Sequence, residues 1–138
     1  MNNKPKYDPE FLKEMIMDAI GNIQDPELPN TLEDLDIVAE DRIEVKATDS
    51  NYHATIVWIP TKSTCSYANN IALCMRYKLQ EEYPDINLKL DIILKEGSHV
   101  TKMEIDKQVN DKERIAAALE NPDVLQMIKK STGSIYEH

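Results

Sequence analysis

The sequence predicts an α+β fold, in which a small and mostly antiparallel sheet of about three strands has helices packed against it. Three observations lead to this prediction. Some segments repeat apolar residues at helical spacing, and others alternate strictly between apolar and polar residues. The two kinds of segment follow one another in the order helix, hairpin, helix, strand and further helices. A length of 138 residues suits one hydrophobic core, so we expect a single domain over residues 1–138.

The first predicted element is a helix that starts at Pro9. Asp8 is a favourable N-cap, and proline is well tolerated at the first helical position. Gly21 is expected to end this helix in the left-handed conformation. Residues 25–30 then form a link rich in turn residues and proline. This link is either a structural corner or a binding loop.

Two strands are predicted next, over residues 37–45 and 52–59, and a turn at residues 48–51 joins them into a hairpin. Pro60 ends the second strand, and a polar loop leads into a long helix over residues 65–83, which Pro84 closes. A third alternating segment, residues 88–94, is the last strand.

The rest of the chain is predicted to be helical. Thr101 and Asp111 carry capping signals, and Asn121 with Pro122 separates a last short helix.

The charge of the chain limits the classes of partner. Its net charge is −9, from 25 acidic and 16 basic side chains. Phosphate backbones are bound mainly by Lys and Arg, so we expect no direct binding of nucleic acid. Acidity can steer a protein toward basic protein surfaces. No apolar run has the length of a membrane span, and the first residues lack the apolar core of a signal peptide. We therefore expect a cytoplasmic protein without membrane attachment, and a nuclear presence is left open.

Cys65 is the most informative residue, because it lies where a strand loop turns into a helix. Unpaired N–H groups at a helix start lower the pKa of a thiol placed there. Thr64 and Ser66 add hydroxyl groups, and Lys62 would add positive charge if it folded back toward the sulfur. The alternative is that Cys65 is a small buried apolar residue, which is the interpretation we give to Cys74.

Two further residues form a hypothetical site with Cys65. His99 and Glu96 follow the last predicted strand, in a turn that could approach the loop before the long helix. Cys65 would then be a nucleophile with His99 as base, or the three would bind zinc or iron. The alternative for His99 is an ordinary loop residue. His53 is predicted to be a surface or cross-strand residue.

Four ordered motifs resemble one family. They are residues 25–35 (DPELPNTLEDL), the segment that runs from Pro60-Thr61 through Cys65-Ser66 to residues 73–76 (LCMR), residues 96–99 (EGSH) and residues 105–121 (IDKQVNDKERIAAALEN). Together they are similar to the eukaryotic targeting-subunit family of cytosolic iron–sulfur assembly. The resemblance covers nearly the whole chain after the first helix.

The resemblance implies a fold shared with bacterial SufT-like and PaaD-like proteins, and the function of an adaptor rather than an enzyme. It implies a complex with a WD-repeat propeller and a HEAT-repeat scaffold, which delivers iron–sulfur clusters to apo-proteins. It maps the functional cysteine to Cys65 and a partner-binding block to Asn110, Asp111, Lys112, Glu113 and Arg114. No tightly bound cofactor is expected, while a transient cluster or zinc and a homodimer are left open.

The chain departs from the resembled family at one position. The residue before the cysteine is usually His in that family, and it is Thr64 here. The start of the helix is therefore the main feature expected to activate Cys65. The alternative functions are a cysteine-dependent enzyme and a zinc or iron carrier, each using Cys65 with His99.

Overall fold

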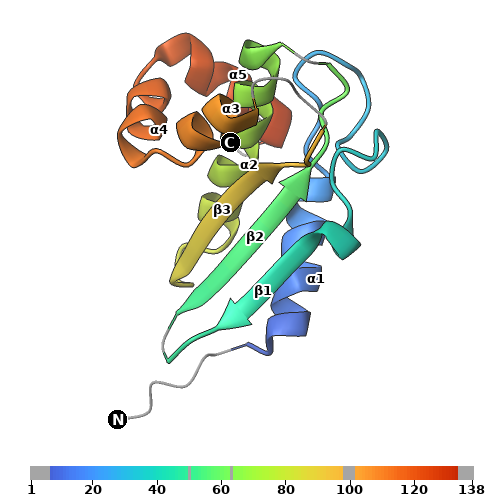
Figure 1. The fold of residues 1–138 in the computed structure, drawn as a ribbon. Coiled ribbons are helices and arrows are strands. Elements are labelled where there is room, and N and C mark those ends of the chain that lie inside the picture. The colour runs from blue at the N-terminus through green and yellow to red at the C-terminus, as the bar shows by residue number, and fades with distance from the viewer. Residues whose placement is uncertain (1–6, 50, 63, 98–101, 134–138) are drawn as a thin grey trace.

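The structure is a computed structural model that describes residues 7–49, 51–62, 64–97 and 102–133. In chain order the elements are α1 (Pro9–Gly21), the 3-10 helix η1 (Glu40–Arg42), β1 (Ile43–Ala47), β2 (Tyr52–Trp58), α2 (Cys65–Glu82), β3 (Leu88–Leu94), α3 (Lys102–Val109), α4 (Lys112–Leu119) and α5 (Pro122–Thr132). The predicted α+β class and the three-stranded sheet are confirmed (Figure 1). None of these helices has the length and apolar character of a membrane span.

The sheet has the order β1-β2-β3, with β2 in the centre. β1 and β2 are antiparallel and form the predicted hairpin, in which Ile43 lies opposite Ile56. β2 and β3 are parallel, and Ile56 lies opposite Ile92. The sheet is therefore mixed, where the sequence predicted a mostly antiparallel one. The reason is α2, because a helix between two neighbouring strands carries the chain back to the end where the first strand began.

The first strand is shorter than predicted. Residues 37–38 are buried, but they precede η1, and β1 begins only at Ile43. The backbone N–H of Ile37 donates to the Leu32 carbonyl, and the Ile37 carbonyl accepts from the N–H of Ile59. Asp36 just before them has a positive φ of 56°. Residues 37–38 thus pack in the core, while the hydrogen bonds of Ile37 go to loop residues. A buried loop segment of this kind and a strand have the same pattern of apolar residues in the sequence.

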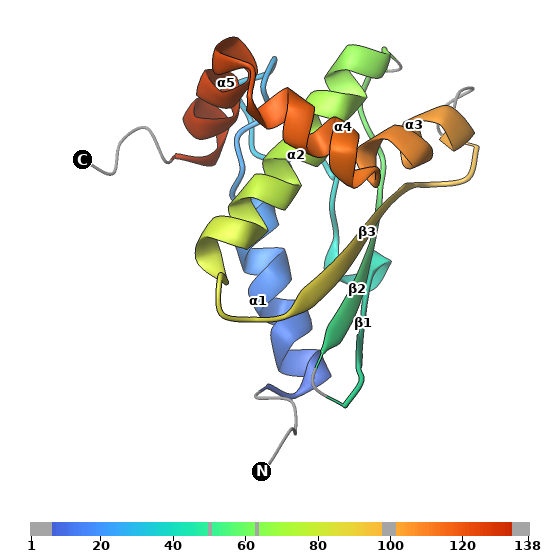
Figure 2. The same ribbon diagram turned by 90° about the vertical axis from the view of Figure 1, so that its left-hand side faces the viewer.

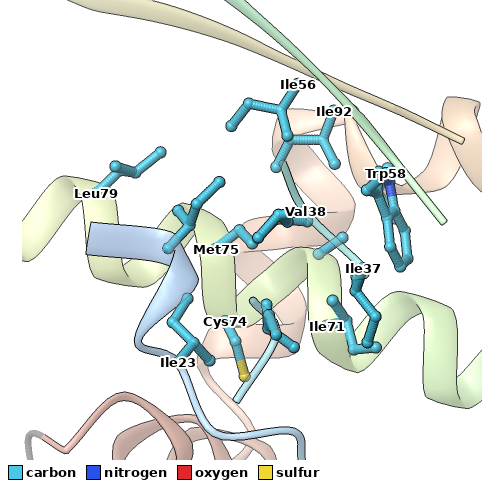
Figure 3. Close-up of a cluster of buried hydrophobic side chains, with 14 of the residues drawn as sticks. Ile23, Ile37, Val38, Ile56, Trp58, Ile71, Cys74, Met75, Leu79 and Ile92 are labelled. Atoms are coloured by element: carbon cyan, nitrogen blue, oxygen red, sulfur yellow. The ribbon is translucent and has the colours of Figure 1, made fainter. Parts of the chain in front are cut away.

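One face of the sheet carries the core. The inward side chains of β2 are all buried, and they are Tyr52, Ala54, Ile56 and Trp58. Helices α1 and α2 cover this face, while α3, α4 and α5 gather around α2 at the end of the sheet where β2 and β3 finish (Figures 1 and 2). Figure 3 shows Ile56, Trp58 and Ile92 from the sheet facing Ile71, Met75 and Leu79 of α2.

Gly21 has a different role from the one predicted. It is the last residue of α1, and the positive-φ glycines among the described residues are Gly97 and Gly133. A Cβ on Gly21 would come within 2.8 Å of the Glu33 Oε1 atom, and the Gly21 carbonyl accepts from the Glu33 N–H at 3.2 Å. Gly21 therefore ends α1 beside the flexible Glu33 side chain and without a positive φ, and the left-handed end belongs to α5, where Gly133 has a φ of 84°.

We expect Gly21→Ala to change the free energy of unfolding by less than about 1 kcal/mol, because alanine favours helix and the close Glu33 carboxylate is the end of a flexible side chain. Gly133→Ala is the matched control. It should destabilise by roughly 1 kcal/mol, since alanine resists a positive φ. Urea unfolding of both variants measures the difference. Equal losses in the two variants would contradict the assignment of Gly21.

Candidate functional site

The candidate site lies at the end of the sheet where the parallel strands β2 and β3 have their carboxyl ends. Trp58 and Leu94 are the last paired residues of β2 and β3. The loop before α2 and the turn after β3 consequently leave the sheet at the same end (Figure 1). In α/β folds, functional loops commonly follow the carboxyl ends of the strands.

Cys65 is the first residue of α2, as predicted, and its side chain is not among the parts that the structure describes. The preceding Thr64 is the N-cap and makes no side-chain capping hydrogen bond. The first turn of α2 also contains no acidic residue. The start of this 18-residue helix therefore has no carboxylate of its own first turn to offset the partial positive charge of its N–H groups.

Lys62 forms an ion pair with Glu27, and its approach to the Cys65 sulfur stays a prediction. Its Nζ atom lies 2.8 Å from the Oε1 atom of Glu27, and 5.8 Å from the ring centroid of Tyr67. Its charge is thus engaged with the link at residues 25–30. Because both partners are partly exposed, this ion pair fixes the direction of the loop more than it stabilises the fold.

A buried carboxylate joins the same two loops beneath the surface. Asp25 is only 2% exposed. Its Oδ1 atom accepts from the N–H groups of Glu27 at 2.7 Å and Leu28 at 2.9 Å. Its Oδ2 atom accepts a short hydrogen bond from the Tyr67 hydroxyl, whose oxygen also lies 2.7 Å from the Thr61 Oγ1 atom. The link at residues 25–30 is thereby tied to the loop before Cys65 and to the first turn of α2.

The environment of Tyr67 favours its protonated hydroxyl. Burial is the largest cause and the hydrogen bond to Asp25 the next, and together they raise the pKa of Tyr67 to about 12. The hydroxyl therefore acts as a donor at neutral pH. The pattern Asp-Pro in the sequence was a sign of the local turn, because an Asp side chain often bonds to N–H groups two and three residues on. The contact with Tyr67, 42 positions away, had no such sign.

The other members of the hypothetical site are only partly described. Glu96 is exposed in the turn after β3, where Gly97 has a φ of 81°. His99 lies outside the described residues. The grouping of Cys65, His99 and Glu96 therefore stays a prediction. Among the described residues there is no group of three His, Cys, Asp or Glu side chains placed to hold a metal ion.

Two predictions about single residues are confirmed. His53 lies on β2, and its Nε2 atom is 2.7 Å from the Oδ2 atom of Asp91 on β3, so His53 makes a cross-strand contact. Cys74 is fully buried, and burial raises the pKa of its thiol to about 12. The Cys74 thiol is therefore protonated at neutral pH. Figure 3 shows Cys74 among the buried hydrophobic side chains.

Asn110, predicted to bind partners, uses its whole amide inside the chain. Its Oδ1 atom accepts from the Ile92 N–H at 2.9 Å and from the Arg76 guanidinium. Its Nδ2 atom donates to the carbonyls of Ile92 at 3.0 Å and Asp106 at 2.7 Å. An asparagine amide offers two acceptor and two donor sites, so none is left for a partner. A role of Asn110 in binding would therefore act through the position of its neighbours.

The remaining predicted partner-binding residues start α4. Asp111 is the N-cap, and its Oδ1 atom accepts from the N–H groups of Glu113 at 2.9 Å and Arg114 at 3.3 Å. Lys112, Glu113 and Arg114 are exposed. Their charges are accessible to a partner, and their role in binding stays a prediction.

The fold and the site define a class of protein: a small α+β domain with a cysteine at a helix start, held on the carboxyl edge of a mixed sheet. No family model matches the chain. Protein AE7 of Arabidopsis thaliana is 49% identical over 113 residues, which cover 82% of this chain and 70% of that protein. MIP18 family protein FAM96A of Dictyostelium discoideum is 42% identical, with 83% of this chain and 87% of that protein covered. Cytosolic iron-sulfur assembly component 2B of Mus musculus is 38% identical, with 83% and 69% covered.

The chain belongs to the MIP18 family. Identities of 38–49% over most of the chain establish this membership and confirm the resemblance drawn from the four motifs.

Proposed function

We propose that this protein is a non-enzymatic adaptor of cytosolic iron–sulfur protein assembly, and that it helps to deliver clusters to cytosolic and nuclear apo-proteins. The observation that carries the proposal is family membership. Relatives in mouse and in Dictyostelium discoideum, each 38% identical to the chain, are named cytosolic iron-sulfur assembly component 2B. We expect the protein to act in the cytosol and to serve nuclear apo-proteins as well.

Cys65 is the residue through which the adaptor works. It starts α2, beside loops that Asp25 and Tyr67 tie together below the surface. A helix start favours an anion such as a thiolate, and no acidic residue of the first turn opposes it. A thiolate in this place suits brief contact with a cluster or with zinc, although Thr64 replaces the His usual in the resembled family.

The partners are proteins. We expect a WD-repeat propeller subunit and a HEAT-repeat scaffold, together with apo iron–sulfur clients. The exposed side chains of Lys112, Glu113 and Arg114 at the start of α4 offer charged contacts to such partners. A chain that brings such proteins together acts as an adaptor.

The test compares the two cysteines. We expect Cys65→Ala to abolish activation of an apo iron–sulfur reporter enzyme in cells that lack the native protein. Its free energy of unfolding should change by less than about 0.5 kcal/mol, as for other surface substitutions. Cys74→Ala is the matched control: it should destabilise the core and retain reporter activation. Alkylation of the native chain by iodoacetamide should modify Cys65 alone, because Cys74 is buried.

Several results would contradict the proposal. A Cys65 thiol that alkylates only on unfolding would be a core residue. Substrate turnover by the purified chain that disappears in Cys65→Ala would indicate an enzyme. Stoichiometric zinc or iron that resists a mild chelator would indicate a metal carrier. Retention of reporter activation in Cys65→Ala would remove the cysteine from the mechanism.

A further inference from the structure

The two outer edges of the sheet are treated differently. On β3, side chains satisfy the backbone: the Ile92 N–H and carbonyl bond to Asn110, and the Leu94 N–H donates to the Asp106 Oδ1 atom at 2.8 Å. The Leu90 carbonyl accepts from Arg76 at 3.1 Å. An edge closed in this way cannot pair with another strand. β1 forms the other edge, and no strand among the described residues pairs with its outer side.

The register shows which groups β1 presents outward. The Thr48 N–H donates to the Asn51 carbonyl at 2.8 Å, so this pair is hydrogen-bonded across the hairpin. Hydrogen-bonded pairs alternate along an antiparallel ladder. Val45 and Ala47 therefore direct their N–H and carbonyl groups away from β2. Within the described parts of the chain, no hydrogen bond reaches these outward groups of Val45 and Ala47.

A groove follows this edge. It is lined by Pro9, Glu10 and Lys13 of α1, by residues 41–45, and by Thr55 and Val57 of β2. A hollow beside an unpaired strand edge can receive an extended peptide, whose backbone pairs with the edge.

The groove carries three acidic side chains, Glu10, Asp41 and Glu44, against two basic ones, Lys13 and Arg42. Residues 8–44, to which the α1 and β1 sides of the groove belong, contain twelve acidic and two basic side chains, while the whole chain has a net charge of −9. The three acidic side chains are exposed. The Glu44 Oε1 atom lies 3.7 Å from the Lys46 Nζ atom, an exposed ion pair of the kind that contributes little and that a partner's cation can replace. Of the two basic residues, Arg42 donates to the Asp36 carbonyl at 2.8 Å and lies 3.8 Å from its carboxylate. A basic side chain is thus complementary to the groove on both sides of the edge strand.

We propose that the outer edge of β1 is a docking site for an extended, Lys- or Arg-containing segment of a partner protein, which adds to the sheet as a fourth strand. Backbone hydrogen bonds to Val45 and Ala47 provide the pairing, and Glu10 and Glu44 select basic side chains. A second copy of this chain fits less well, because pairing two β1 edges would bring two acidic segments together. The inference goes beyond the proposed function and does not depend on Cys65.

The experiment uses the full chain and a pool of blocked octapeptides in which Val, Ile or Thr alternates with Lys or Arg. A matched pool has Glu in place of the basic residues, and a third carries N-methyl groups that prevent backbone pairing. We expect only the basic, unmethylated pool to bind. Hydrogen exchange followed by NMR should show slower exchange at the Val45 and Ala47 amides on binding. Glu10→Lys combined with Glu44→Lys should weaken binding at least about tenfold, and raised salt should weaken it too.

Val45→Pro removes an outward N–H and should abolish binding, since edge strands tolerate proline. Equal binding by the N-methylated pool would overturn the proposal, independently of how well Val45→Pro folds. Failure of the basic pool to bind, or protection at amides away from β1, would overturn it as well. Concentration-dependent protection of Val45 and Ala47 without peptide would assign the edge to a second copy instead. Retained binding in Cys65→Ala would separate this site from the proposed function.

Discussion

Replacing Asn110 with alanine is expected to lower the free energy of unfolding by roughly 3 kcal/mol, because four hydrogen bonds are lost and partly buried partners remain without replacement. The partners are the Ile92 N–H and carbonyl, the Asp106 carbonyl and the Arg76 guanidinium. Urea denaturation followed by circular dichroism measures the change.

Asn121→Ala is the matched control for Asn110→Ala. Asn121 caps α5 from an exposed position and accepts from the N–H groups of Asp123 and Val124. Its removal should cost about 1 kcal/mol, the usual effect of losing an N-cap. Asn110→Ala should also expose the outer edge of β3 and increase aggregation. A loss no larger than that of Asn121→Ala would show that the amide of Asn110 is replaced by water at little cost.

Replacing Asp25 with alanine is expected to destabilise the chain by about 3 kcal/mol, since hydrogen bonds to a charged group contribute more than neutral ones. The buried carboxylate accepts from Glu27, Leu28 and Tyr67, and its removal frees the link at residues 25–30 from α2. The same urea experiment measures the loss.

Two further variants allow the loss of unfolding free energy in Asp25→Ala to be compared with smaller losses. Tyr67→Phe removes one hydroxyl and should cost about 1 kcal/mol. Glu27→Ala breaks the partly exposed ion pair with Lys62 and should cost less than about 0.5 kcal/mol. The expected order of losses is therefore Asp25→Ala, Tyr67→Phe and Glu27→Ala. If Glu27→Ala cost as much as Asp25→Ala, the surface pair would be what holds the loops.

The sequence predicted where Cys65 lies, but it did not predict the hydrogen bonds that hold the surrounding segments together. The position of Cys65 at a helix start follows from a strand, a loop and a helix that are adjacent along the chain. Asp25 and Tyr67 meet across 42 positions, and Arg76 and Asn110 across 34. No local pattern announces such contacts, because either residue alone is also typical of an exposed surface.

The sequence alone determined the order and type of the elements, the burial of Cys74 and the family. These depend on periodicity, capping residues and motifs, which are properties of neighbouring residues. The tertiary structure decided the direction of β3, the late start of β1 at Ile43 and the role of Gly21. It also decided that side chains close the outer edge of β3, while no strand in the described part of the chain pairs with the outer edge of β1. The physical reason is the same throughout: hydrogen bonds between distant segments form only where packing brings the segments together.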